Sequence, residues 1–567
     1  MIAKNHSCNI IISLLVSHGI KQIVLSPGSR NAPIITVAAR NKSLNKTVIV
    51  DERCAAFVAL GMCKATNGSV PVALVCTSGS ALLNYAPAIA EAYYHNLPLI
   101  VISADRPIEW IDQDDSQTLR QYEALANYVK KSYNIPSTCV SDTQKWFVNR
   151  IVNDAIITSN NGKKGPVHIN IQLDEPLHQY IGANIDSQRT ISMPSIIQTL
   201  EDTTIDLLSA NVNNKKVLVI AGFQNCEDKY WLSSVTNKLE SILNKCPNIV
   251  FLSESIANIY IKDGICNIDR VLSQMSADDK DALKPDIIIT FGGAIISRFI
   301  KQFMRDIPSC QHWHIGITDT TIDCFKKLSY RISIHPNTFI NQIYNKLHLS
   351  SSIHSYYRKQ WIDIARKAEI NHNLYMETCE WSDLKAFSII LPKIKGNLHL
   401  SNGTPIRYHQ LFKHNTKVKK IYCNRGVSGI DGCTSTAIGA TLNSCENTIL
   451  ITGDLSAQYD IGALAINNIP PTFKMVVINN GGGGIFKFIG STSSLPEVDE
   501  YLVTKSNLPL DCLAKGFGFE YYLAQNEHEL EAAIDPFLEC SSKPAILEII
   551  TQSSKSAIIL SKYLSKN

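Results

Sequence analysis

The chain has 567 residues, and at roughly 150 residues per domain this length predicts three or four domains and excludes a single small module. Its 54 Lys and Arg residues nearly balance its 50 Asp and Glu residues, and no basic run indicates a nucleic-acid partner. The 16 cysteines include no CxxC pair, which is typical of reduced thiols in a long chain. The longest apolar stretches are too short to span a bilayer. We therefore expect a cytoplasmic protein without a membrane segment.

Along the chain, a first helix within the N-terminal 20 residues is followed by short β-branched runs. Each run precedes turn residues and a helix-like stretch, which is the pattern of parallel α/β units. The pattern predicts three doubly wound parallel-sheet domains over 1–185, 186–355 and 356–567, and the outer two repeat the same order of elements. The expected strands are 22–26, 47–51, 72–76, 99–103, 166–171, 216–222, 248–253, 286–293, 312–316, 397–401, 420–424, 448–454, 474–480 and 544–550.

The strongest chemical signal joins the segment 453–456 (GDLS) to the segment 479–484 (NNGGGG). Asp454 ends one expected strand and Asn480 ends a later one, so both should reach the sheet edge where open α/β folds bind ligands. A carboxylate, an amide oxygen and a backbone carbonyl suit Mg²⁺, which usually fills its remaining positions with phosphate and water. An ordinary strand-end turn and a flexible glycine loop are the alternative interpretation.

The Gly-Asp pair followed after about 25 residues by Asn-Asn resembles the signature of thiamine diphosphate enzymes. That family is built from three α/β domains, and the cofactor lies between the first domain of one subunit and the third domain of another. The resemblance therefore implies a homodimer or homotetramer with active sites at subunit interfaces. It also implies that 1–185 binds the pyrimidine and that 356–567 binds the diphosphate through Mg²⁺ or Mn²⁺.

Glu52 lies in the segment 51–53 (DER), after an expected strand. Thiamine chemistry requires a carboxylic acid beside N1′ of the aminopyrimidine, so that the cofactor can lose its C2 proton. The resemblance assigns this catalytic role to Glu52. The alternative is an acid at a helix N-terminus, favoured there by the helix dipole.

Arginines recur in segments that follow or flank expected strands. An arginine side chain binds a carboxylate through two parallel hydrogen bonds, so several converging arginines predict a substrate with several carboxylates. For any single arginine, a surface or interdomain ion pair is the alternative. The segments are 26–33 (SPGSRNAP), 103–107 (SADRP), 116–121 (SQTLRQ) and 423–432 (CNRGVSGIDG).

Together with DER, TSGS, GDLSAQYD and NNGGGGIF, these segments closely resemble the 2-succinyl-5-enolpyruvyl-6-hydroxy-3-cyclohexene-1-carboxylate synthase family of menaquinone biosynthesis. The resemblance runs from about residue 20 to 490 and is thin in the middle domain, where FGGAIISR is the one matching stretch. It implies a transferase that decarboxylates 2-oxoglutarate with thiamine diphosphate. The succinyl carbanion equivalent would then add to isochorismate in a 1,4 sense. Both substrates are dicarboxylates.

The resemblance also assigns individual residues by position. Ile430 would bend the cofactor, and Ile485 with Phe486 would cover its reacting face. The substrate carboxylates or hydroxyls would be bound by Arg30, Arg106, Gln117, Arg298, Arg407 and Arg425. The cofactor would be bound by Glu52, Gly403, Ile430, Gly453, Asp454, Leu455, Ser456, Asn480, Ile485 and Phe486, and the metal by Asp454, Asn480 and the carbonyl of Gly482.

Three positions depart from the expected pattern. Gly481 stands where an asparagine is usual, Ser297 where a lysine often precedes the matched arginine, and Gly403 where a serine is common. The change at Ser297 removes one positive charge, which weakens the expected contribution of the middle domain.

Other functions remain open from the sequence. The nearest is another thiamine diphosphate-dependent 2-oxo acid decarboxylase or an acetolactate-type synthase, which would need fewer carboxylate-binding groups. A degenerate thiamine-binding subunit would have no need of Glu52. A dinucleotide-binding protein should show a GxGxxG motif with an acidic residue about 20 positions later, and neither VLVIAGFQN nor IIITFGGA in the middle domain contains one.

Overall fold

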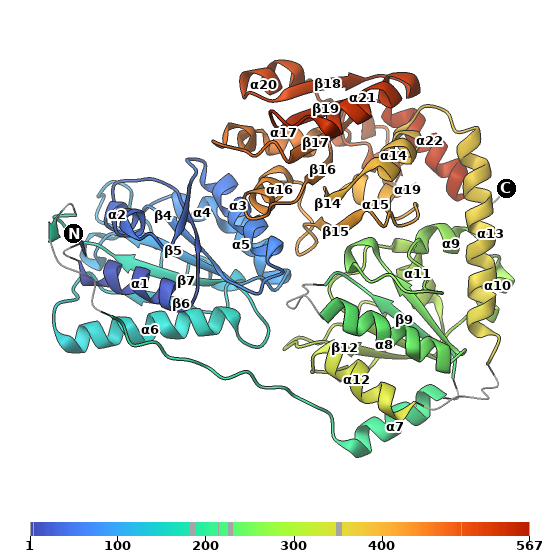
Figure 1. Ribbon diagram of the computed structural model, residues 1–567, viewed down its shortest axis with the longest axis horizontal. Helices are drawn as coiled ribbons and strands as arrows, with labels where there is room; N and C mark the ends of the chain where they lie inside the picture. Colours follow the sequence, from blue (N-terminus) through green and yellow to red (C-terminus); the bar gives the residue numbers. More distant parts are fainter. Residues whose placement is uncertain are drawn as a thin grey trace. The chain divides into compact units, whose positions relative to one another are not determined.

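The structure is a computed structural model that describes residues 2–3, 5–177, 179–181, 187–213, 215–224, 231–347, 354–488 and 490–565. Its strands form three large sheets (Figure 1) and one two-stranded antiparallel pair, β1 (Ile2–Ala3) with β8 (Tyr180–Ile181). Every neighbouring pair in the three large sheets is parallel. The predicted fold class, three doubly wound parallel α/β sheets, is confirmed.

The N-terminal sheet has the strand order β3-β2-β4-β5-β7-β6. Helices α1, α2 and α6 cover one face and share a hydrophobic core with it, while α3 and α5 belong to the other face. The strands are β2 (Gln22–Leu25), β3 (Asn45–Val48), β4 (Val72–Cys76), β5 (Leu99–Asp105), β6 (Ser132–Ile135) and β7 (Val167–Gln172). The helices are α1 (His6–Ser17), α2 (Ala32–Arg40), α3 (Glu52–Ala65), α4 (Ala81–Asn84), α5 (Ala86–Tyr94) and α6 (Asp142–Asn160).

The central sheet has the order β10-β9-β11-β12-β13. One face carries α7, α8 and α12, and the other carries α9, α11 and α13. The strands are β9 (Val217–Ala221), β10 (Ile249–Ser253), β11 (Ile287–Phe291), β12 (Gln311–Ile315) and β13 (Leu328–Ile332). The helices are α7 (Asp202–Asn213), α8 (Trp231–Lys245), α9 (Ile268–Gln274), α10 (Ala277–Ala282), α11 (Arg298–Asp306), α12 (Pro336–Lys346) and α13 (Tyr357–Glu377).

The C-terminal sheet has the order β15-β14-β16-β17-β19-β18, which is the order of the N-terminal sheet when the strands of each are counted from its first. The internal repeat expected from the sequence is therefore present. The strands are β14 (Gly396–Leu400), β15 (Val418–Cys423), β16 (Thr448–Gly453), β17 (Phe473–Asn479), β18 (Glu520–Ala524) and β19 (Ala545–Ile550). The helices include α14 (Asp383–Ile390), α15 (Pro405–His409), α16 (Cys433–Leu442), α17 (Asp454–Tyr459), α18 (Ile485–Phe488), α19 (Gly490–Ser493), α20 (Leu510–Gly516), α21 (Glu527–Glu539) and α22 (Ser553–Leu564).

The chain divides into two compact units that do not follow the order of the sequence. The first unit is Met1–Ser195, Asn424–Glu446 and Tyr459–Pro470, and the second is Ile196–Cys423, Asn447–Gln458 and Pro471–Asn567. Helix α16 therefore belongs to the first unit, although the strands before and after it belong to the second. The domain boundaries near 185 and 355 stay a prediction.

The sequence misplaced or missed strands mainly at sheet edges. The strand expected at 47–51 is observed two residues earlier, as β3 (Asn45–Val48). Val50, beyond the end of β3, is 78% exposed. Strands β6, β13 and β18 were not predicted, and each lies at an edge of its sheet. An edge strand buries fewer side chains than an inner one, so it need not be an apolar run.

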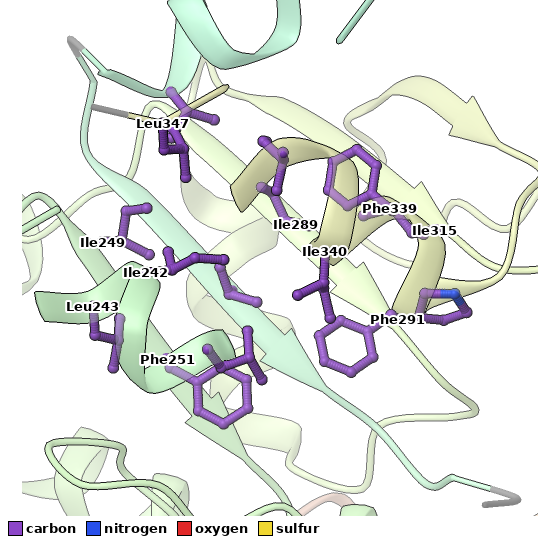
Figure 2. A pocket seen from close by; sticks show the side chains of 15 residues that line it. Ile242, Leu243, Ile249, Phe251, Ile289, Phe291, Ile315, Phe339, Ile340 and Leu347 are labelled. Carbon is purple, nitrogen blue, oxygen red and sulfur yellow. The ribbon is translucent and has the colours of Figure 1, made fainter. Parts of the chain in front are cut away.

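The core of the central sheet contains a small cavity of about 40 Å³ on the side of α8 and α12. Figure 2 shows Ile242 and Leu243 of α8, Phe251 of β10 and Ile340 of α12 among the side chains that surround it. All 15 lining residues are apolar, so a water molecule there would find no polar side-chain partner. The cavity is a packing feature of the core and lies among none of the predicted site residues.

In the first unit, α3 and α16 pack backbone against backbone. A Cβ atom on Gly61 of α3 would lie 2.0 Å from the carbonyl oxygen of Thr436. A Cβ atom on Gly439 of α16 would lie 2.1 Å from the carbonyl oxygen of Val58. Only glycine permits this approach, because any side chain would force the helices apart.

We expect Gly439→Ala to lower the free energy of unfolding by about 1–3 kcal/mol, because its methyl group must displace the backbone of α3. Urea unfolding followed by circular dichroism measures the change. Gly516→Ala is the matched control, since a Cβ atom on this α20 residue would meet no atom within 4 Å, and alanine favours a helix. Equal loss of stability in both variants would contradict the close contact.

Candidate active site

In the second unit, several predicted residues lie at the carboxyl edge of the C-terminal sheet. Strand β14 is flanked by β15 and β16, so the direction in which strands are added reverses between β14 and β16. Open α/β sheets bind ligands at such a reversal. Gly403 follows β14, Gly453 ends β16, and Asn480 follows the neighbouring strand β17.

Asp454 is the first residue of α17 and is buried, with 3% of its surface exposed. One carboxylate oxygen, Oδ1, accepts the backbone N–H of Leu455 at 2.8 Å, whereas Oδ2 is buried and has no hydrogen-bond partner. Burial raises the pKa of Asp454 to about 6. The hydrogen bond from Leu455 opposes the change, and so do the N–H groups of Gly482 and Gly481, which face the carboxylate without meeting hydrogen-bond geometry. A buried carboxylate oxygen without a hydrogen-bond partner can bind a cation.

Asn480 is also buried, and its amide is oriented by Asp383. The Nδ2 group of Asn480 donates to Oδ2 of Asp383 at 2.9 Å, and Oδ1 of Asn480 has no partner. Oδ1 of Asp383 accepts the hydroxyl groups of Thr551 at 2.5 Å and of Ser556 at 3.0 Å. Because a carboxylate only accepts, Asp383 fixes which end of the Asn480 amide presents its oxygen.

The glycine loop after β17 depends on backbone conformations that suit glycine. Gly481 has φ +83° and Gly482 has φ +142°. A Cβ atom on Gly482 would lie 2.5 Å from the carbonyl oxygen of Thr504 and 2.6 Å from that of Val503. The Gly482 carbonyl, expected to bind the metal, accepts the N–H of Gly484 at 2.9 Å. A carbonyl oxygen has a second lone pair, so this bond is compatible with a metal contact.

The remaining predicted residues of this unit are distributed around the same edge and on the central sheet. Leu455 and Ser456 lie in the first turn of α17, and Ile485 with Phe486 begins α18, where both are half-buried. Arg298 is exposed at the first position of α11.

Arg407 lies on α15, where its Nη1 donates to the carbonyl of Gly403. Its charge also acts on Asp269 of α9. Burial raises the pKa of Asp269, while a hydrogen bond from Ser297 and the charge of Arg407 partly oppose the rise. Arg407 and Ser297 are therefore both close to one half-buried carboxylate.

Glu52 lies in the first unit, at the first position of α3. Asp51 caps the helix by accepting the N–H of Cys54 at 3.0 Å, and Glu52 itself is half-buried. Burial raises the pKa of the Cys76 thiol at the end of β4, and the negative charge of Glu52 raises it further. The Glu52 carboxylate is therefore near the carboxyl edge of the N-terminal sheet.

Arg30 and Arg106 lie near each other in the first unit. Burial lowers the pKa of Arg30, and the positive charge of Arg106 lowers it further. Arg30 donates to the carbonyl of Leu173 at 3.0 Å. Arg106 pairs with Asp115 at 2.8 Å and donates to the carbonyl of the next residue, Ser116, at 3.0 Å.

Gln117 directly follows Asp115 and Ser116, which Arg106 contacts. It is exposed, with φ +54°, and its Cα lies 3.5 Å from the position of a Cβ atom on Gly79. Gln121, further along the same segment, accepts the N–H of Gly79 at 2.8 Å. The structure thus brings Arg30, Arg106 and Gln117 to one edge of the N-terminal sheet.

Arg425 and Ile430 belong to a loop of the first unit that precedes α16. Arg425 is half-buried, and Ile430 is 37% exposed. Glu91 of α5 accepts the N–H groups of the two residues after Arg425, Gly426 at 2.8 Å and Val427 at 2.7 Å.

The chain is similar to one family model and to several known proteins. Residues 7–124 match the family model described as thiamine pyrophosphate enzyme, N-terminal TPP binding domain. A 2-succinyl-5-enolpyruvyl-6-hydroxy-3-cyclohexene-1-carboxylate synthase from Porphyromonas gingivalis is 37% identical over 98% of this chain and 96% of its own. Synthases of the same name from Flavobacterium psychrophilum, at 37%, and Cytophaga hutchinsonii, at 36%, each match 98% of this chain and 97% of their own.

This chain belongs to the 2-succinyl-5-enolpyruvyl-6-hydroxy-3-cyclohexene-1-carboxylate synthase family. The resemblance found in its motifs is confirmed, and its N-terminal domain is of the thiamine diphosphate-binding type.

Several buried carboxylates were not predicted, among them Glu91, Asp383 and Asp460. Glu91 had a signal, because it is the one charged residue in an otherwise apolar, small-residue stretch, AIAEAYY. Asp383 had no such signal, since an acid in the first turn of a helix is ordinary. Asp460 ends GDLSAQYD, but nothing there indicates that it accepts the N–H of Ser435 at 2.6 Å.

The part of the synthase-family chain that the structure describes contains no cluster of three or more His, Cys, Asp or Glu side chains able to hold a metal. A metal at Asp454 would therefore depend on the amide of Asn480, a backbone carbonyl and oxygens of a bound ligand. Among the described residues, no helix has the length and apolar character needed to cross a bilayer.

Proposed function

We propose that this protein decarboxylates 2-oxoglutarate and adds the resulting succinyl unit to isochorismate in a 1,4 sense, as a thiamine diphosphate-dependent transferase of menaquinone biosynthesis. Similarity to synthases of this name along 98% of the chain is the observation that carries the proposal. Another 2-oxo acid decarboxylase or acetolactate-type synthase is the runner-up. The set of Arg30, Arg106, Arg407 and Arg425 favours dicarboxylate substrates over simpler ones.

Asp454, Asn480 and the Gly482 carbonyl would hold Mg²⁺ or Mn²⁺, and the metal would hold the diphosphate. Two buried oxygens without hydrogen-bond partners, Oδ2 of Asp454 and Oδ1 of Asn480, support this assignment. The two residues follow adjacent strands, β16 and β17. Hard cations of this kind prefer oxygen ligands. Gly403, Gly453, Leu455 and Ser456 would surround the diphosphate.

When bound, thiamine diphosphate supplies a nucleophilic carbon at C2. Glu52 would hold or donate a proton at N1′ of the aminopyrimidine. Ile430, Ile485 and Phe486 would shape and cover the cofactor and exclude water from it. The carboxylates and hydroxyls of the substrates would be bound by Arg30, Arg106, Gln117, Arg298, Arg407 and Arg425.

The active unit would be a homodimer or homotetramer, with Glu52 of one subunit and Asp454 of another at each site. Exposed apolar side chains of the first unit, including Val427 at 47% and Ile430 at 37%, support a covering partner. We also propose a cytoplasmic location. The cysteines in the described ranges are free, as expected in a reducing compartment.

The proposed reaction is tested with purified protein, thiamine diphosphate, Mg²⁺ and 2-oxoglutarate, with and without isochorismate. We expect isochorismate to increase CO₂ release and 2-oxoglutarate consumption, because the adduct can then leave the enzyme. Pyruvate in place of 2-oxoglutarate is the control for the runner-up. Equal consumption of 2-oxoglutarate without isochorismate, or faster consumption of pyruvate, would contradict the assignment.

Glu52→Gln should slow exchange of the cofactor C2 proton by about 100-fold or more, because the amide cannot protonate the ring. Proton NMR of the bound cofactor measures the exchange, and circular dichroism should show a normal fold. Asp51→Asn is the matched control, since it removes a charge from the same helix end and leaves a good N-cap. Rapid exchange of the C2 proton in Glu52→Gln would contradict the catalytic role of Glu52.

Asp454→Ala should leave the unliganded protein as stable as before or more so, because the buried carboxylate has one oxygen without a partner. The same variant should bind thiamine diphosphate in Mg²⁺ at least about tenfold more weakly. Calorimetric titration and thermal unfolding, each with and without Mg²⁺, measure both effects. Asp535→Ala, which removes an exposed partner of Lys393, is the control. Unchanged Mg²⁺-dependent affinity would refute the metal anchor.

A further inference from the structure

Glu91 is a fully desolvated carboxylate on α5, with 1% of its surface exposed. It lies in an apolar helix, and a charge in such a place is costly unless it is paired and hydrogen-bonded. The residues around it meet that requirement. His95, one helical turn later, lies 3.2 Å from its Oε1, and the ammonium group of Lys64 lies 4.0 Å from the same atom.

The charge state of this group follows from its surroundings. Burial would raise the pKa of Glu91, but the His95 hydrogen bond and the Lys64 charge outweigh burial and lower the pKa below its usual value. Burial, followed by the Lys64 charge, lowers the pKa of His95 to about 4. At neutral pH the cluster is therefore an ionised Glu91 beside an uncharged imidazole and a lysine.

The remaining bonds of Glu91 go to the loop that carries Arg425. Oε1 accepts the N–H of Gly426 at 2.8 Å, and Oε2 accepts the N–H of Val427 at 2.7 Å. Hydrogen bonds to an ionised acceptor are about twice as strong as those between neutral groups. Each oxygen of one carboxylate thus holds one of the two peptide groups that follow Arg425.

The other side of the loop is held by Lys64 of α3. Its Nζ donates to Oδ1 of Asn424 at 2.8 Å, and Nδ2 of Asn424 donates to Oγ1 of Thr436 at 3.0 Å. Arg425 thus lies between a side chain anchored by Lys64 and two peptide groups anchored by Glu91. The two anchors belong to one buried ion pair.

Gly426 is the residue that allows this close approach. A Cβ atom there would lie 2.5 Å from the backbone carbonyl oxygen of Glu91 and 3.0 Å from its Cδ. Any side chain would push the loop away from α5 and break both bonds. The glycine and the glutamate therefore act together.

We propose that Glu91 is a positioning residue that fixes the loop 424–427 so that Arg425 can bind a substrate carboxylate. The inference rests on the proposed function for the role of Arg425. Lys64 would fix the other end of this loop by donating a hydrogen bond to Asn424. Glu91 itself would touch no substrate, so its effect on catalysis would be exerted through Arg425.

Two variants distinguish the effect of the Glu91 charge from the effect of its side-chain length. Glu91→Gln keeps the length of the side chain, but its amide can accept only one of the two N–H groups. Glu91→Asp keeps the charge beside Lys64 and shortens the reach. We expect at least one of the amides of Gly426 and Val427 to exchange with deuterium about tenfold faster in Glu91→Gln, and both to do so in Glu91→Asp, because each exchanging amide loses its acceptor. Asp154→Asn, which removes an ion-paired carboxylate of α6 in the same unit, should leave that exchange unchanged.

The kinetic test is a double-mutant cycle with Arg425→Ala. Glu91→Gln alone should lower kcat/KM by about tenfold, chiefly by raising the KM of the substrate whose KM Arg425→Ala raises. In the Arg425→Ala background, Glu91→Gln should cause no further loss, because its effect passes through Arg425. If Glu91→Gln does not fold, Glu91→Asp takes its place in the cycle.

Additive losses in the cycle, or unchanged exchange at 426 and 427 in both variants, would overturn the proposal and leave Glu91 a general structural residue. The two proposals fail differently. Absence of isochorismate-dependent turnover in the wild-type protein would refute the proposed function. Faster exchange of the two amides would still support the ordering of the loop by Glu91.

Discussion

The close contact of α3 with α16 is the constraint on which the rest of the first unit depends. Gly61 and Gly439 let the two helix backbones touch, so the starts of both helices are fixed relative to each other. Helix α3 begins at Glu52, and α16 follows the loop that contains Arg425 and Ile430. Two segments more than 300 positions apart in the sequence are thereby placed with little freedom.

The start of α16 shows how this contact is completed. Its N-cap residue is Gly432, which has no side chain to accept an N–H. Asp460 supplies the missing acceptor, taking the N–H and hydroxyl of Ser435 and the thiol of Cys54 on α3. Glycine is itself required at 432, because a Cβ atom would lie 2.1 Å from the ring of Phe57. Close packing and capping are therefore parts of one arrangement.

Much of the fold could be predicted because inner strands of parallel sheets are apolar on both faces. Strands β4, β5 and β9, for example, are buried at every position. The missed strands β6 and β18 keep several positions partly open, so their sequences lack that signal. The sequence could single out Asp454 and Asn480 as candidates because each directly follows an inner strand. Glu91 and Asp383 were not, since their roles come from partners 335 and 97 positions away.

The three positions that differ from the expected pattern have local features that suit the residues present. Gly481 has φ +83°, a conformation that glycine adopts freely and asparagine tolerates better than most residues, so either can occupy the turn. Gly403 has φ +91°, which a serine would adopt only with strain. Ser297 accepts the N–H of Ile300 as the N-cap of α11 and donates to Asp269. A lysine can accept no hydrogen bond, so at 297 this chain has a helix cap in place of a positive charge.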